Sequence, residues 1–155
     1  MGYDTFGKRS RWLEYAKDGD VYAQYELAQS YCCRMEEGKL DGFEALKWWC
    51  ASAKNGYAKS QVKVGKLYEH QELMKDADVP KDDLRAYAWY KLAKKRGSEE
   101  GRDGFLRLRE SMTSDQITKA EKLLADKKNI KCGDDAVKKI APLPTEEKDP
   151  KKKSH

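Results

Sequence analysis

Residues 16–31 read AKDGDVYAQYELAQSY, and residues 53–68 read AKNGYAKSQVKVGKLY. The second stretch follows the first at an offset of 37 positions, which aligns Gln24 with Gln61 and Tyr31 with Tyr68. Another block, LDGFEALKWW at residues 40–49, recurs at an offset of 41 as KDDLRAYAWY at residues 81–90. Blocks that recur intact while their connectors change length indicate an array of similar structural units.

The spacing inside each block is that of an α-helix. Ala23, Leu27 and Tyr31 recur every four residues and form one apolar stripe. Ala28 and Gly65 occupy the same position of the repeat, where a small residue lets a neighbouring helix approach closely. No segment shows the β-branched alternation that is typical of strands, so the sequence predicts an all-α protein.

The ends of the helices are marked as well. Asp41 is expected to cap the helix that follows it, and Thr113 with Gln116 has the spacing of a capping box. Gly56 and Gly97 each follow a helical block, where a left-handed glycine ends a helix. The pattern therefore predicts helix hairpins joined by connectors of variable length.

The bulky aromatic residues keep the register of the repeat. Trp48 and Trp49 align with Trp89 and Tyr90, which indicates packing between hairpins rather than a ligand site. Trp12 falls at the register of Trp49 and predicts an additional N-terminal helix that closes the array.

At these residues the chain resembles the Sel1-like repeat family, which is related to tetratricopeptide repeats. The pattern is AxxG…AQxxL[GA]xxY followed by DxxxAxxW[YW]…G, and the likeness covers about residues 10–127. Residues 98–127 lose the Trp-Tyr signature, as expected of a unit whose outer side meets water. The resemblance implies a right-handed α-solenoid of about three hairpins with an N-terminal helix and a degenerate C-terminal capping hairpin. It also implies a concave binding surface and work as an adaptor or scaffold.

Composition narrows the possible functions. Apolar residues make up 39% and charged residues 38% of the chain, and a thin solenoid accounts for so polar a balance. The net charge of +5 is partly due to the lysine-rich C-terminus, so we do not expect nucleic-acid binding. No apolar run approaches the length of a membrane span. The N-terminal residues lack the apolar region of a secretory signal, which predicts a cytoplasmic protein. A periplasmic location is the alternative if a signal has been removed.

The four cysteines, Cys32, Cys33, Cys50 and Cys132, have no metal-ligand spacing and are expected to be partly buried thiols in a reducing compartment. Adjacent cysteines point about 100° apart on a helix and rarely pair. A bridge between Cys33 and Cys50 within one hairpin would be mismatched by roughly 10 Å along the helix axes.

Catalysis has little support in the sequence. Cys33 and His70 occupy equivalent positions of neighbouring units, but no third residue is placed to orient the histidine. His155 is the last residue of the lysine-rich end. We therefore expect no enzyme activity, no catalytic residues, no cofactor and no metal ligands.

A partner-binding surface is expected opposite the apolar stripe. On this surface an exposed tyrosine lies next to a strip of basic residues, which suits a protein partner with an acidic surface. They are Tyr22, Glu26, Gln29 and Cys33 on the first helix, and Lys59, Lys63, Lys66 and His70 one repeat later. The alternative is that these positions form ordinary solvated helix faces.

The chain is expected to divide into a repeat domain at residues 1–128 and a flexible lysine-rich tail at residues 129–155. The tail carries three prolines and charge clusters and cannot form a core, although residues 137–143 could order on a partner. The predicted function is a non-catalytic adaptor, scaffold or accessory subunit of a larger bacterial assembly. An immunity-type inhibitor of a cognate effector enzyme is the alternative, and a hydrolase ranks below both.

Overall fold

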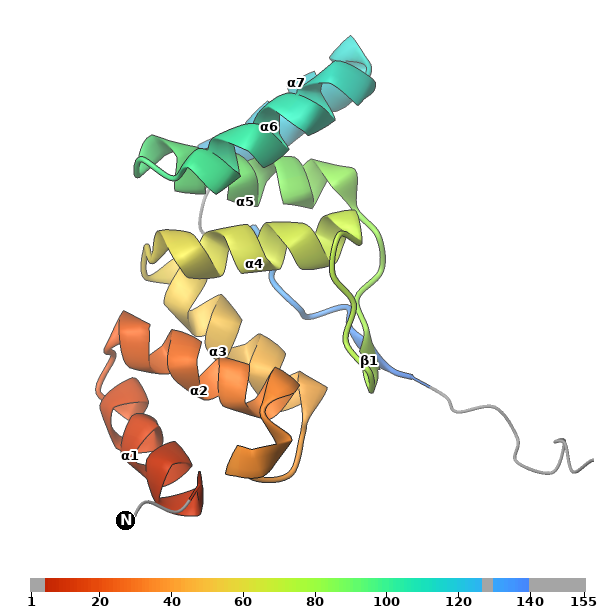
Figure 1. Cartoon of the computed structure of the whole chain (residues 1–155). Coiled ribbons are helices and arrows are strands. Elements are labelled where there is room, and N and C mark those ends of the chain that lie inside the picture. The colour runs from red at the N-terminus through yellow and green to blue at the C-terminus, as the bar shows by residue number, and fades with distance from the viewer. Residues whose placement is uncertain (1–4, 127–129, 140–155) are drawn as a thin grey trace, which may run out of the picture.

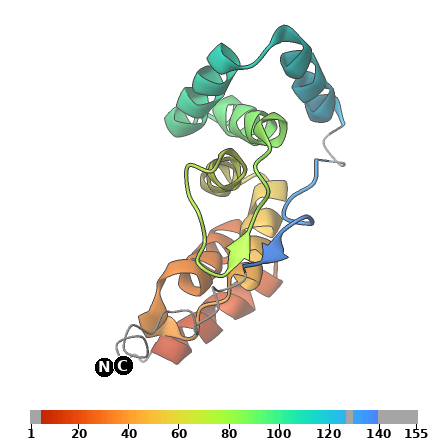
Figure 2. The same ribbon diagram turned by 90° about the vertical axis from the view of Figure 1, so that its right-hand side faces the viewer.

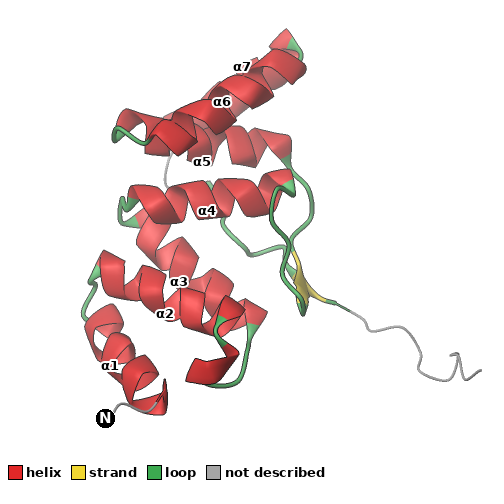
Figure 3. Ribbon diagram, viewed as in Figure 1, coloured by secondary structure: helices red, strands yellow, loops and turns green. Residues whose placement is uncertain are grey.

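The structure, a computed structural model, describes residues 5–126 and 130–139 (Figure 1). Its helices and strands run in the order α1 (Thr5–Lys17), α2 (Val21–Cys33), α3 (Gly42–Lys54), α4 (Ala58–Glu69), β1 (Ala77–Asp78), α5 (Asp83–Lys95), α6 (Glu99–Ser111), α7 (Ser114–Ala125) and β2 (Val137–Lys138), with a 3-10 turn at Met35–Glu37. From α1 to α6 each helix packs against the next, and the stack forms an elongated solenoid (Figure 3). The predicted all-α repeat architecture with an N-terminal helix is confirmed.

The helices begin and end where the sequence patterns place them. Asp41 caps α3 by accepting hydrogen bonds from the backbone N–H groups of Phe43 and Glu44. Thr113 and Gln116 form the predicted capping box at the start of α7. The turns after α3 and α5 contain Gly56 and Gly97 with φ angles of +96° and +92°, a backbone conformation that disfavours a side chain.

Within the buried core, one aromatic residue is wedged between two glycines. Tyr90 on α5 is 1% exposed, and its ring lies between α4 and α6. A Cβ atom at Gly65 or Gly104 would lie 2.8 or 2.7 Å from that ring, closer than side chains approach one another. Small residues at these two positions are therefore what lets α4 and α6 close on the tyrosine. Trp48, Trp49 and Trp89 are buried too, as their register predicts.

The capping hairpin is more open than the others. Helices α6 and α7 both pack against α5, and α6 follows α5 in the stack (Figure 2). Its turn is short, because Met112 ends α6 and Thr113 already caps α7. Ala120 and Leu124 supply the buried side of α7, in agreement with the predicted amphipathic last helix.

The end of the chain differs from the prediction. Residues 130–139, which the sequence places in a flexible tail, pack back along the solenoid; Ile130 is 2% exposed and Cys132 is 7% exposed. Strand β2 pairs antiparallel with β1, aligning Ala77 with Lys138 and Asp78 with Val137 (Figure 2). The packed part of the chain thus continues beyond the predicted boundary at residue 128, and residues 140–155 of the predicted tail lie outside the described residues. We call residues 130–139 the return strap.

The expectation of free thiols is wrong. Cys50 on α3 forms a disulfide with Cys132 on the return strap, with the two Cα atoms 5.8 Å apart. The partner of Cys50 was missed because Cys132 falls in the stretch expected to be a tail. Cys32 and Cys33, the last two residues of α2, have their sulfur atoms in contact. Among the described residues, no cysteine is free.

Hydrogen bonds reinforce the return strap. The hydroxyl of Tyr68 accepts a hydrogen bond from the backbone N–H of Gly133 at 2.7 Å and donates to Asp135 at 3.1 Å. Arg85 pairs with the same carboxylate at 2.6 Å. Burial is the main cause that raises the pKa of Tyr68 to about 12, so this hydroxyl stays protonated as a donor at neutral pH. No helix in the described part of the chain is long and apolar enough to cross a membrane.

Candidate partner-binding face

The predicted binding residues lie on α2 and α4, except His70, which directly follows α4. Tyr22 is 49% exposed and belongs to a row of aromatic rings in edge-to-face contact. The ring centroids are 5.7 Å apart for Trp12 and Tyr22, 6.4 Å for Tyr22 and Tyr57, and 5.7 Å for Tyr25 and Tyr57. The row runs across α1, α2 and the start of α4. It therefore holds Tyr22 in one orientation on the surface.

Sequence reasoning missed two members of this row, Tyr25 and Tyr57. Tyr57 stands 37 positions after Asp20, which caps α2 with its carboxylate, whereas Tyr57 makes no side-chain cap for α4. An aromatic residue where the repeat has a capping aspartate was the signal that it serves another purpose. Burial raises the pKa of Tyr25 and of Tyr57, so both hydroxyls remain neutral.

A hollow of about 290 Å³ lies beside the tyrosines. Residues of three helices and of the connector after α4 form it: Tyr25, Lys59, Val62, Lys63, Lys66, Glu72 and Glu100. All three predicted lysines thus line a single depression. We call the aromatic row together with this hollow the α2–α4 face.

The charges of the α2–α4 face are largely paired within the chain. Lys63 pairs with Glu72, and Lys66 lies 2.7 Å from Glu100 and 3.6 Å from Glu72. The hydrogen bond that Lys66 donates to Glu100 raises the pKa of Lys66, although partial burial opposes this shift. The strip that was predicted to be basic therefore carries charges of both signs. The carboxylates belong to the connector after α4 and to α6, not to the helix that carries the lysines. Lys59 makes no ion pair within the described residues.

The remaining predicted residues are held by their own neighbours. Glu26 accepts a hydrogen bond from Arg34 at 3.0 Å, and Gln29 is partly buried. His70 ends α4 in the left-handed conformation with a φ angle of 66°, and its Nε2 lies 2.7 Å from the carbonyl oxygen of Val79. The ring of His70 bonds to Val79 rather than to Cys33, whose sulfur atom lies against that of Cys32.

This arrangement suits recognition of a surface rather than bond chemistry. Ordered tyrosines beside paired charges are typical of protein interfaces, where aromatic residues supply contact area and the polar rim supplies register. Within residues 5–126 and 130–139, no group of three His, Cys, Asp or Glu residues is placed to hold a metal ion.

No protein-family model matches the chain, and no curated protein matches it significantly. The fold is similar to c5321, a protective antigen present in uropathogenic Escherichia coli strains that displays an SLR fold. That match has a TM-score of 0.68 at 22% sequence identity and covers 81% of this chain and 26% of that one. It is also similar to a Sel1 repeat protein from Oxalobacter formigenes, with a TM-score of 0.59 at 23% identity, covering 68% of this chain and 41% of that one.

The class of protein is thus a helical-repeat solenoid, and its particular form is the Sel1-like repeat fold predicted from the sequence. The chain spans about a quarter and about two fifths of the two solved chains, so their likeness concerns the fold alone.

Proposed function

We propose that the chain is a non-catalytic adaptor or scaffold that binds a protein partner on the α2–α4 face. The observation that carries the proposal is the aromatic row, which presents Tyr22 about half exposed and fixed between Trp12 and Tyr57. A rigid aromatic side chain loses little conformational entropy when a partner covers it, and such residues are frequent interface hot spots.

The ion pairs on the α2–α4 face change the surface charge that we expect of the partner. Lys63 and Lys66 are already neutralised by Glu72 and Glu100, so the face favours a partner with an apolar or aromatic centre and mixed charge at its rim. Lys59 supplies the unpaired cation beside the hollow. A purely acidic partner would have to compete with the carboxylates of this chain.

The proposal is tested with Tyr22→Ala combined with Lys59→Glu. A tagged wild-type chain is used to isolate its partner from the native lysate, and the affinity of that purified partner is then measured by calorimetry. We expect the double variant to lose at least about tenfold in affinity, as at an interface hot spot. Its melting temperature should fall only slightly, because Lys59 and about half of Tyr22 are exposed and only the ring contacts with Trp12 and Tyr57 are lost.

Tyr15→Ala is the matched control, because Tyr15 is 54% exposed but lies on α1 outside the aromatic row. It should bind the partner like the wild type. Equal affinity of the wild type and the Tyr22→Ala/Lys59→Glu variant would overturn the proposal.

We also infer that the chain matures in an oxidising compartment, which for a bacterial protein is the periplasm. The disulfide between Cys50 and Cys132 supports this, since structural disulfides persist outside reducing cytoplasm. Protein isolated from its native host and alkylated without reductant should carry no label at either residue. Labelling of both would favour the cytoplasmic location expected from the sequence.

A further inference from the structure

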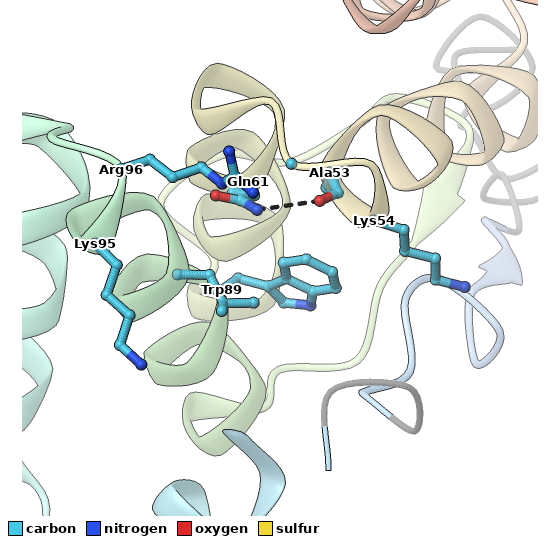
Figure 4. Close-up of a pocket in the computed structure, with 8 residues that line it drawn as sticks. Ala53, Lys54, Gln61, Trp89, Lys95 and Arg96 are labelled. Carbon is cyan, nitrogen blue, oxygen red and sulfur yellow. Dashed lines mark hydrogen bonds between the residues drawn. The ribbon is translucent and has the colours of Figure 1, made fainter. Parts of the chain in front are cut away.

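A second and larger hollow lies on another side of α4, between the turn that joins α3 to α4 and the C-terminal half of α5 (Figure 4). Its volume is about 830 Å³, within the range of ligand-binding clefts. It is lined by Ala53, Lys54, Gly56, Gln61, Trp89, Leu92, Lys95 and Arg96. We call it the α3–α5 pocket; it shares no lining residue with the hollow of the α2–α4 face.

Two buried polar atoms in the wall of the pocket have no partner. The side-chain amide of Gln61 donates to the carbonyl oxygen of Ala53 at 3.1 Å, but its Oε1 accepts nothing, although Gln61 is only 3% exposed. Nε1 of Trp89 likewise donates to nothing, and this residue is 2% exposed. A buried polar group without a partner is costly, so a ligand that supplies both an N–H donor and a carbonyl acceptor would satisfy the site.

The rim of the pocket is positively charged without compensation. Lys54, Lys95 and Arg96 are exposed and make no ion pair within the described residues, and none of the lining residues is acidic. Lys95 and Arg96 reach in from one side and Lys54 lies on the other, with the Trp89 ring between them (Figure 4). This differs from the α2–α4 face, where carboxylates of the chain itself occupy the lysines.

The guanidinium of Arg96 lies over the bare backbone of Gly56. A Cβ atom at that glycine would lie only 2.6 Å from Nη2 of Arg96, so the guanidinium rests where no side chain fits. In this position the guanidinium lines the hollow and can offer its hydrogen-bond donors to a ligand.

The preceding repeat shows which of these features are particular to this pocket. The unpartnered atoms are not, because Oε1 of Gln24 and Nε1 of Trp48 at the matching positions also lack partners. By the 37- and 41-residue offsets, the matching positions hold Ala16, Lys17, Gly19, Gln24, Trp48, Ala51, Lys54 and Asn55. Leu92 and Arg96 thus replace an alanine and an asparagine. The second repeat has gained a larger apolar wall and one more cation at this place.

We propose that the α3–α5 pocket binds an acidic, apolar-containing peptide segment of a partner protein. Carboxylates of the segment pair with Lys54, Lys95 and Arg96, and one apolar side chain packs on Trp89 and Leu92. A backbone N–H of the segment reaches Oε1 of Gln61, and a backbone carbonyl accepts from Nε1 of Trp89. The proposal rests on the proposed function, because it assigns a second recognition site to a protein-binding chain.

A peptide fits these groups better than a polyphosphate does. Phosphodiesters and phospholipid phosphates offer oxygen acceptors to the cations, but these groups carry no N–H for the buried oxygen of Gln61. An acidic peptide offers carboxylates, backbone N–H groups and apolar side chains together, which matches the three kinds of group in the pocket.

The test uses a fluorescent pool of N-acetylated hexapeptides in which Glu alternates with Leu, Ile or Phe, and a second pool with Gln in place of Glu. The folded wild-type chain should enrich members of the acidic pool over the second one. The Lys95→Glu/Arg96→Glu variant should bind the enriched peptides at least about tenfold more weakly with an unchanged melting temperature, because two ion pairs are reversed in sign.

Lys17→Glu is the matched control, since Lys17 holds the position of Lys54 one repeat earlier and lies outside the pocket. It should bind the peptides like the wild type. Tyr22→Ala should also bind them, so that failure of the α2–α4 face and failure of the pocket are told apart. The proposal is overturned if no acidic peptide is enriched or if the double variant binds equally well. It is also overturned if only an oligonucleotide or an anionic phospholipid vesicle binds in a manner that depends on Lys95 and Arg96.

Discussion

The carboxylate of Glu69 accepts hydrogen bonds from two helices other than its own. Although Glu69 is only 8% exposed, Tyr90 on α5 donates to it at 2.7 Å, and Arg107 on α6 approaches with two nitrogens at 3.0 and 2.7 Å. Burial alone would raise the pKa of Glu69, but the hydrogen bonds of Arg107 and Tyr90 outweigh it and lower that pKa. Burial and the same carboxylate raise the pKa of Tyr90, which keeps its hydroxyl a donor.

Replacing Glu69 by Gln should destabilise the protein in a pH-dependent way. A carboxyl whose folded pKa is lowered contributes stability above its unfolded pKa, and that contribution is lost as pH falls through the folded value. At pH 7 we expect Glu69→Gln to lower the free energy of unfolding by about 1–3 kcal/mol. The difference from the wild type should shrink as pH falls below the ordinary pKa of a glutamate, about 4.3, and through the lowered pKa that Glu69 has in the folded protein. Urea unfolding at several pH values measures this difference in the free energy of unfolding.

Glu100→Gln provides the comparison for that experiment. Its side chain is 66% exposed and pairs with Lys66 at the surface, so its removal should change the free energy of unfolding by no more than about 1 kcal/mol. A difference between Glu69→Gln and the wild type that stays constant from pH 7 to pH 3 would contradict the role assigned to the Glu69 charge.

Among the secondary-structure elements, the sequence predicts the helices, because their hydrogen bonds join residues that are close in the chain. An α-helix bonds only within itself, so spacing and caps such as Asp41 and Thr113 locate it without knowledge of the rest of the chain. Strands β1 and β2 have two residues each, too few for an alternating pattern, and 58 positions separate them in the sequence. No local sequence pattern predicts that these two strands pair.

The residues of the candidate sites likewise differ in whether local sequence patterns predict them. Tyr22 and the three lysines follow from the helical register, and they do line one face. The carboxylates of Glu72 and Glu100 come from a connector and another helix, so their pairing with the lysines is a property of the tertiary structure. The α3–α5 pocket lies between these cases, because aligning the repeats already shows Leu92 and Arg96 in place of small or neutral residues.

For the whole molecule, the return strap alters how a repeat protein holds together. Units of a solenoid contact only their neighbours, so stability is propagated from one unit to the next. Here residues 130–139 come back from the capping hairpin to α4, α5 and α3, through Tyr68, Arg85 and Cys50. The strap thus links the first complete hairpin to the end of the array, and unfolding should be more cooperative than in an unlinked solenoid.

Removing the Cys50–Cys132 disulfide should therefore lower the stability of the whole chain. The bond closes a loop across 82 positions, and in the chain-entropy description a loop of that size is worth about 4.5 kcal/mol. Cys132→Ser should lose about this much free energy of unfolding, measured by urea denaturation without reductant, and the reduced wild type should match it. The Cys32→Ser/Cys33→Ser variant is the control, because a bond between neighbours closes no long loop and its loss should cost far less. A wild-type chain equally stable with and without reductant would show that the return strap is held by Tyr68, Arg85 and the β1–β2 pair alone.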